Sequence, residues 1–264
     1  MQRLKSASAQ RAITRAAAGV AAQARHVAAF LSTLPAPAFA QATRLPGWDL
    51  RLLTAHLVAQ QRELIEHAEQ PTAARPSSVA DALRAGGARR RRSDAHVHDI
   101  AGNDDGPELA RQLRYNVGEM VALIDDELPD VVGLNPPLRI RDALRLHAVE
   151  WIVHSDDINA VFGAAPVELD PQALADAVRC LAEALAEANP GRSIEVRVPP
   201  FSAVQCGAAG DPTHTRGTPP NVVEVEPLVF LRLATGRLTF DEALGHGLTA
   251  SGTRADISAM LPLG

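Results

Sequence analysis

Two residues of metal-binding type stand four positions apart near the middle of the chain. These are Glu150 and His154, and at about 100° per helical residue they lie on one face, one turn apart. A second histidine, His56, sits among apolar residues and is expected to point inward. Two imidazoles and one carboxylate suit zinc or a similar divalent ion and leave a coordination position for water or substrate. The pattern indicates a three-ligand metal site.

Other interpretations of these residues stay open at this point. A histidine on an apolar helix face is more often a hydrogen-bonded core residue than a ligand, and a Glu/His pair four apart also arises by chance. His147 competes for the same site because it lies near the same stripe of the helix. The remaining candidates are His67, His96 and His98, of which the last two sit in a polar segment and are expected to be solvated.

The elements that would position these residues are helices. Apolar residues recur at spacings of three and four, and Pro, Gly and Asp mark the ends. The predicted helices span residues 6–32, 50–69, 107–128 and 140–162. Asp49 is the expected N-cap of the second helix and Gly163 the expected end of the fourth. Four helices of this kind predict a four-helix bundle with one long crossover.

The crossover, residues 71–106, is rich in Pro, Ser, Gly, Arg and Asp. We expect a long mobile connection there, with a short helix at most around residues 79–83, and such connections often form the mouth of a site. It contains the run Arg89–Arg92, which is interpreted as part of a solvated loop, with a phosphate or nucleic-acid contact as the alternative.

The pattern changes after Gly163. A helix is predicted over residues 171–188, and alternation of apolar and polar residues predicts strands. The expected strands are 194–198, 201–206, 221–226 and 248–251, and the expected later helices are one from Pro227, a short one at 239–244 and a last one at 254–261. This is a small α+β domain with a mostly antiparallel sheet. We therefore predict two domains, residues 1–165 and 166–264.

The composition fits a globular protein. Hydrophobic residues make up 46% and charged residues 22% of the 264 residues, and the formal net charge of −5 does not favour a nucleic-acid binder. Two cysteines, Cys180 and Cys206, form no disulfide framework or zinc motif and are expected to be reduced. The first residues lack the apolar core of a signal peptide and no run is long enough to span a membrane, which predicts a cytoplasmic protein. The sequence indicates no oligomeric state.

Two segments carry a resemblance to a known family. LPGWDLRLLTAHLV (residues 45–58) and RLHAVEWIVHSDDI (residues 145–158) resemble the mycothiol-dependent maleylpyruvate isomerase family, within the larger DinB-like bundles. The family pattern is a Pro-Gly-Trp turn and a helix with one His, then Glu, three residues, His, two residues and Asp. The resemblance implies that His56, Glu150 and His154 bind a divalent metal, expected to be zinc, and that Asp157 supports the site or the helix packing.

The tail carries a second resemblance. LTASGTRADISAML (residues 248–261) resembles the closing strand and helix of the sterol-carrier-like domain that follows such bundles in actinobacterial proteins. Chains of this build are called sterol carrier family proteins, a name that does not establish a sterol as the ligand.

Three functions remain open. In the resembling enzymes a low-molecular-weight thiol, mycothiol, becomes a thiolate at the metal and adds to an electrophile, so the resemblance implies a thiol transferase or isomerase; Arg145 could bind a carboxylate of substrate or cofactor, or be a surface residue. The second function is a carrier of lipid or another apolar ligand in the tail. The third is a regulatory or interaction protein without turnover. Candidate residues lining a tail pocket are Leu228, Phe230, Leu231 and Phe240.

Overall fold

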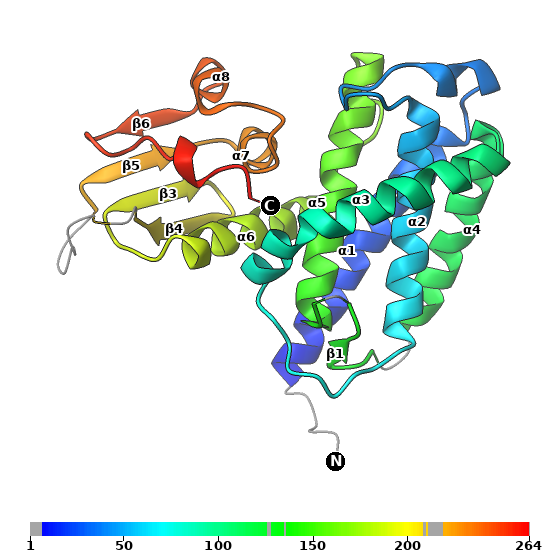
Figure 1. Cartoon of the computed structure of the whole chain (residues 1–264), viewed down its shortest axis with the longest axis horizontal. Helices are drawn as coiled ribbons and strands as arrows, with labels where there is room; N and C mark the ends of the chain where they lie inside the picture. The colour runs from blue at the N-terminus through cyan, green and yellow to red at the C-terminus, as the bar shows by residue number, and fades with distance from the viewer. Residues whose placement is uncertain (1–6, 126–127, 135, 208–209, 211–218, 264) are drawn as a thin grey trace.

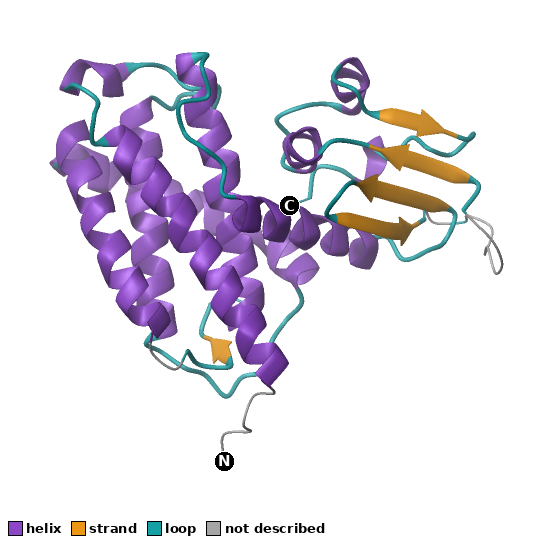
Figure 2. Cartoon of the chain, turned by 180° about the vertical axis from the view of Figure 1, so that it is seen from behind, coloured by secondary structure: helices purple, strands orange, loops and turns teal. Residues whose placement is uncertain are grey.

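The computed structural model of the chain describes residues 7–125, 128–134, 136–207, 210 and 219–263 (Figure 1). It has a helical N-terminal part and a C-terminal part of helices and a sheet, which lie side by side (Figure 2). The predicted bundle is confirmed, and its helices are α1 (Ala7–Leu31), α2 (Leu50–Ala68), α4 (Gly106–Asp125) and α5 (Ile140–Phe162). No helix among the described residues has the length and apolar character needed to cross a membrane.

The ends of the two site helices follow their local sequence. The Asp49 side chain accepts a hydrogen bond from the backbone N–H of Leu52 and so caps α2. Gly163 ends α5 at φ 68°, a left-handed conformation that glycine adopts without a steric penalty. Both predicted ends are therefore confirmed.

The crossover is not a loop, and that prediction was wrong. Most of it forms the 25-residue helix α3 (Val79–Asn103), capped by Ser78, which runs across the bundle (Figure 1). Its many Ala and Arg residues have high helix propensity, and a few apolar residues at helical spacing bury one face against α2. These residues are Val97, Ile100 and Ala101, packed with Leu52, Ala55 and Ala59. The backbone of Arg89–Arg92 thus belongs to a helix, and the side chains of this run and of His96 lie outside the described part of the chain.

Short elements complete the N-terminal part. A 3-10 helix, η1 (Ala36–Ala40), follows α1, and its Phe39 is buried. The strands β1 (Val131–Val132) and β2 (Leu138–Arg139) pair in antiparallel fashion just before α5.

The C-terminal part begins with α6 (Pro171–Ala188) and contains a sheet of order β4-β3-β5-β6. The β3–β5 pair is parallel and the other two pairs are antiparallel, as the mostly antiparallel prediction required. The strands are β3 (Ile194–Val198), β4 (Ser202–Cys206), β5 (Asn221–Glu224) and β6 (Thr249–Ser251). Two helices, α7 (Pro227–Ala234) and α8 (Phe240–Gly245), follow β5 in the chain and precede β6.

The last predicted helix is absent from the described residues 254–261. Only a 3-10 turn, η2 (Ser258–Met260), forms there. The Asp256 side chain accepts a hydrogen bond from the Ser258 N–H at the start of this turn. Pro262 disfavours the helical conformation at Leu261, which is extended at φ −131° and ψ 155° and ends the turn.

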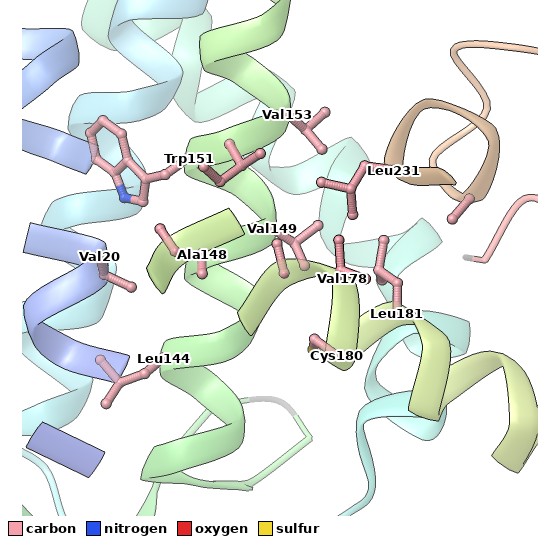
Figure 3. Close-up of a cluster of buried hydrophobic side chains, with 14 of the residues drawn as sticks. Val20, Leu144, Ala148, Val149, Trp151, Val153, Val178, Cys180, Leu181 and Leu231 are labelled. Atoms are coloured by element: carbon pink, nitrogen blue, oxygen red, sulfur yellow. The ribbon is translucent and has the colours of Figure 1, made fainter. Parts of the chain in front are cut away.

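Helix α5 packs on both sides and joins the two parts through one continuous hydrophobic core. Trp151 and Ala148 face α1 of the bundle, whereas Val149 and Val153 face the C-terminal part (Figure 3). The residues that meet them there are Val178 and Leu181 of α6 and Leu231 of α7. Burial on both sides fixes the rotation of α5, and with it the direction of its polar residues.

Candidate metal centre

His56 of α2 and Glu150 and His154 of α5 meet in space. One ligand atom from each lies within 4.8 Å of the other two. The Oε2 atom of Glu150 is 3.4 Å from Nε2 of His56 and 3.2 Å from Nε2 of His154. The structure therefore brings together the three residues that the sequence singled out, and metal binding by them stays a prediction.

The site is open at its carboxylate. The Glu150 side chain is 42% exposed, while the side chains of His56 and His154 are 12% and 9% exposed. Two nearly buried imidazoles and one accessible carboxylate would leave an ion reachable from solvent on one side. This is the arrangement of a site that keeps a coordination position for water or substrate.

The Pro-Gly-Trp turn supports His56. Gly47 adopts φ 78°, and the N–H of Trp48 donates to the carbonyl of Leu45 at 3.0 Å, which closes the turn. The ring of Trp48 then lies edge-on against the His56 ring, with centroids 5.6 Å apart. The turn that the sequence marked thus places an aromatic ring beside one candidate ligand.

Asp157 fixes the orientation of His154. The Nδ1 atom of His154 lies 2.9 Å from Oδ2 of the fully buried Asp157, as expected for an N–H donating to a carboxylate. Because Asp157 holds the Nδ1 proton, Nε2 is the nitrogen that faces Glu150, and it would bind an ion once its own proton is displaced, as in other metal-binding histidines. Asp157 therefore contacts the site, in keeping with the supporting role that the resemblance implied.

Sequence reasoning missed a set of arginines behind the site. Arg232 donates to both carboxylate oxygens of Asp156 at 2.8 and 2.6 Å, and Arg237 to both of Asp157 at 2.9 and 2.7 Å. Arg44 bonds to Asp156 and Asp157 at once. Two adjacent aspartates on a buried helix need cationic partners, so Asp156-Asp157 was a signal that such partners exist. Nothing in the pattern said which arginines supply them.

The charges of the cluster depend on these contacts. Desolvation would raise the pKa of Glu150, but hydrogen bonds from His154 and His56 outweigh it and hold that pKa well below its ordinary value. Desolvation likewise opposes the charged form of Asp157, and the hydrogen bonds from Arg237 and His154 lower its pKa nonetheless. Burial would lower the pKa of His154, whereas hydrogen bonds to Asp157 and Glu150 raise it. Glu150 is therefore ionised, as a carboxylate ligand must be, whereas a metal ion would have to displace the proton that these contacts favour on His154.

The other candidate histidines lie apart from this cluster. His147 is buried in α5, and Nδ1 of His67 bonds to the carbonyl of Glu63 within α2. His98 is exposed on α3. Arg145 pairs with Glu183 of α6 at 2.7 Å, its side chain almost wholly buried between α5 and α6. It is not the surface residue of the alternative interpretation, and its binding of a cofactor stays a prediction.

Two solved structures are similar to the whole chain. One is described as the mycothiol-dependent maleylpyruvate isomerase, with 16% identity and a TM-score of 0.55. The other is a variant of that isomerase with one histidine replaced by alanine, at 15% identity and a TM-score of 0.58. In both comparisons the similarity covers 94% of this chain and 93% of the other, and at this identity it establishes the fold. No curated protein matches the chain.

Two family models match consecutive stretches. Residues 170–263 match the model described as bacterial SCP ortholog. Residues 20–159, which contain the whole His56, Glu150 and His154 cluster, match the model described as the mycothiol maleylpyruvate isomerase N-terminal domain. Since this second match extends over more than half of the chain, the protein belongs to the mycothiol maleylpyruvate isomerase N-terminal domain family.

Proposed function

We propose that His56, Glu150 and His154 bind a divalent metal ion, zinc, and that the protein uses it in a mycothiol-dependent transfer or isomerisation of a small electrophile. The observation that carries the proposal is the meeting of the three ligand atoms within 4.8 Å around an accessible carboxylate. The family and the two isomerase structures support the choice of thiol and reaction class.

The residues present fit such an ion. Two imidazole nitrogens and a carboxylate oxygen form a common ligand set of catalytic zinc. Asp157 holds the Nδ1 proton of His154, so that Nε2 is the available donor. When bound, a divalent cation stabilises a thiolate over the thiol, because it is the largest positive charge in the site.

The chain's own groups would prepare the site for that thiol. His56 and His154 line its buried side, and the Trp48 ring packs against His56 there. Glu150 lies at its open side, where a thiol and an electrophile would arrive. We also propose that the two parts divide between residues 165 and 166, in the connection between α5 and α6, which lies between the two matched stretches.

Metal analysis of untagged protein tests the proposal. We expect stoichiometric metal in the wild type and in the control His98→Ala, which changes an exposed histidine on α3. His56→Ala and His154→Ala should lose the metal while their circular dichroism spectra stay unchanged. Normal metal content in both variants would contradict the site. A conjugation assay with mycothiol and a panel of electrophiles then identifies the reaction, and no turnover by the metal-loaded protein would contradict the catalytic part.

A carrier function of the tail is the second candidate, favoured by the match of residues 170–263 to the bacterial SCP model. Of the proposed lining residues, Phe230 and Leu231 are fully buried in the common core, in the manner of packing residues. Displacement of a fluorescent fatty acid or sterol from the purified protein tests this function. Saturable binding that survives His154→Ala would support the carrier, and the absence of binding would contradict it.

A further inference from the structure

A chain of hydrogen bonds leads from the C-terminal part to a candidate metal ligand. Arg237 lies just after α7 and donates from Nε and Nη2 to the two carboxylate oxygens of Asp157. The Oδ2 atom that accepts from Nη2 of Arg237 at 2.7 Å also contacts Nδ1 of His154 at 2.9 Å. One carboxylate oxygen therefore connects a guanidinium of one part with a ligand imidazole of the other.

The turn after α7 holds Arg237 in place. Gly236 adopts φ 74°, and the backbone N–H groups of Arg237 and Leu238 both donate to the carbonyl of Arg232, at 2.7 and 3.2 Å. The Arg237 side chain is only 14% exposed, and its Nη1 also donates to the carbonyl of Thr235 at 3.4 Å. A bidentate arginine on such an anchored turn fixes both the position and the plane of the carboxylate that it binds.

A neighbouring pair provides an internal comparison. Arg232 of α7 forms the same bidentate contact with Asp156, at 2.8 and 2.6 Å, and so also ties the C-terminal part to α5. Among the described residues, however, the hydrogen-bond partners of the Asp156 carboxylate are Arg44 and Arg232, and none of the three candidate ligands. Arg232 and Arg237 thus make similar contacts between the two parts. Only the carboxylate bound by Arg237, that of Asp157, also contacts a candidate metal ligand.

We propose that Arg237 is a positioning residue of the metal centre, which acts through Asp157 to hold the imidazole of His154 in its ligating orientation. The C-terminal part thereby completes a site whose ligands all belong to the bundle. This inference rests on the proposed metal site. Without Arg237, Asp157 keeps its bonds to Arg44 and His154 but loses the clamp that fixes its plane, so the acceptor for the Nδ1 proton is no longer held in place.

Zinc affinity of the full-length protein tests this proposal. Wild type, Arg237→Gln and Arg232→Gln are stripped of metal and titrated with zinc against a chromophoric chelator, and their thermal unfolding is followed in the metal-free state. We expect both variants to lose similar stability, because each loses one bidentate contact between the parts. Changes to direct partners of metal ligands weaken binding about 10- to 100-fold. Because Arg237 acts through such a partner, Arg237→Gln should bind zinc about 10-fold more weakly than wild type, and Arg232→Gln should stay close to wild type.

Cobalt spectra supply a second readout. The visible absorption of Co²⁺ reports the geometry of its ligands, so the bands of the Co²⁺-loaded Arg237→Gln protein should shift while those of Arg232→Gln match the wild type. If Arg237→Gln does not fold, Arg237→Lys replaces it, because lysine keeps the charge but cannot make the bidentate contact. Its zinc affinity should fall in the same direction.

The outcomes separate this inference from the function on which it rests. A wild-type protein that binds no zinc overturns both. A wild type that binds zinc, together with an Arg237 variant of unchanged affinity and spectrum, overturns the positioning role alone. Equal weakening in Arg232→Gln also overturns it, because the effect would then come from the docking of the two parts.

Discussion

The ring of Trp48 stands edge-on against the ring of His56, at an interplanar angle of 70°. The His56 ring in turn meets the His154 ring at 76°, with centroids 4.8 Å apart. The first aromatic contact comes from a turn that precedes α2, and the second from a helix far along the chain. A residue outside the ligand set thus limits how the His56 ring can rotate.

Replacing Trp48 by leucine should therefore weaken metal binding. Leucine keeps the apolar character of the position but removes the ring that limits rotation of His56. We expect zinc affinity to fall about tenfold, at the lower end of the range for residues that support metal ligands. Chelator competition measures the change. Tyr115→Leu, at an exposed aromatic residue of α4, is the control, and equal affinities in all three proteins would contradict the prediction.

Gln23 is expected to stabilise the connection between the two parts. Its buried amide donates to Ser155 Oγ at 2.8 Å and to the Glu168 carbonyl at 3.1 Å, and accepts from the Asp170 N–H at 2.7 Å. Gln23→Leu leaves these groups without that partner, so the free energy of unfolding should fall by about 1–3 kcal/mol. Urea denaturation measures it. Thr14→Ala, at an exposed site of α1, should change it by less than about 0.5 kcal/mol.

The protein's own thiols should be unreactive in the native state. Burial is the main reason that the pKa of Cys180 rises to about 12, and Cys206 is buried as well. At pH 8 the Cys180 thiol is therefore almost wholly protonated, and a thiol is nucleophilic only as the thiolate. An aromatic disulfide reagent should label neither cysteine before denaturation and both after it. Rapid labelling of the native protein would contradict this prediction and indicate an internal nucleophile.

Replacing two glycines by alanine, one at a time, should change the free energy of unfolding in opposite directions. Gly163 adopts φ 68°, and a Cβ added there would meet nothing within 4 Å. Gly163→Ala therefore meets only the left-handed backbone penalty and should lower the free energy of unfolding by about 1–2 kcal/mol. Gly86 lies inside α3 with equally open space, and Gly86→Ala should raise it by about 0.5–1 kcal/mol. Thermal unfolding of both variants measures the signs, and the same sign in both would contradict the argument.

Local signals in the sequence predicted most of the fold. Asp49 and Gly163 mark helix ends through their own backbone and side-chain chemistry, so the limits of α2 and α5 could be predicted without tertiary information. Helix α3 could not, because its apolar face is narrow and its polar composition is also that of a loop. This face stabilises the helix only because it packs against α2, a tertiary contact that the local sequence does not reveal.

The three candidate ligands could be predicted from the sequence, but the residues that surround them could not. Glu150 and His154 share a helix face by spacing alone, the apolar neighbours of His56 predict that it points inward, and the family pattern joins the three residues in one site. The partners of Asp156 and Asp157 were not predictable, because Arg44, Arg232 and Arg237 reach them through tertiary packing, and many other arginines in the chain carry the same local signal.

Helix α5 buries apolar residues on two opposite faces, one against the bundle and the other against the C-terminal part. A C-terminal part exchanged for that of a distant relative would have to match the shape of the second of these faces. The bundle expressed by itself would expose that face to solvent as an apolar patch prone to aggregation. Substitutions in α5 must therefore fit the packing of both parts, and we expect residues of the two parts that contact this helix to have coevolved.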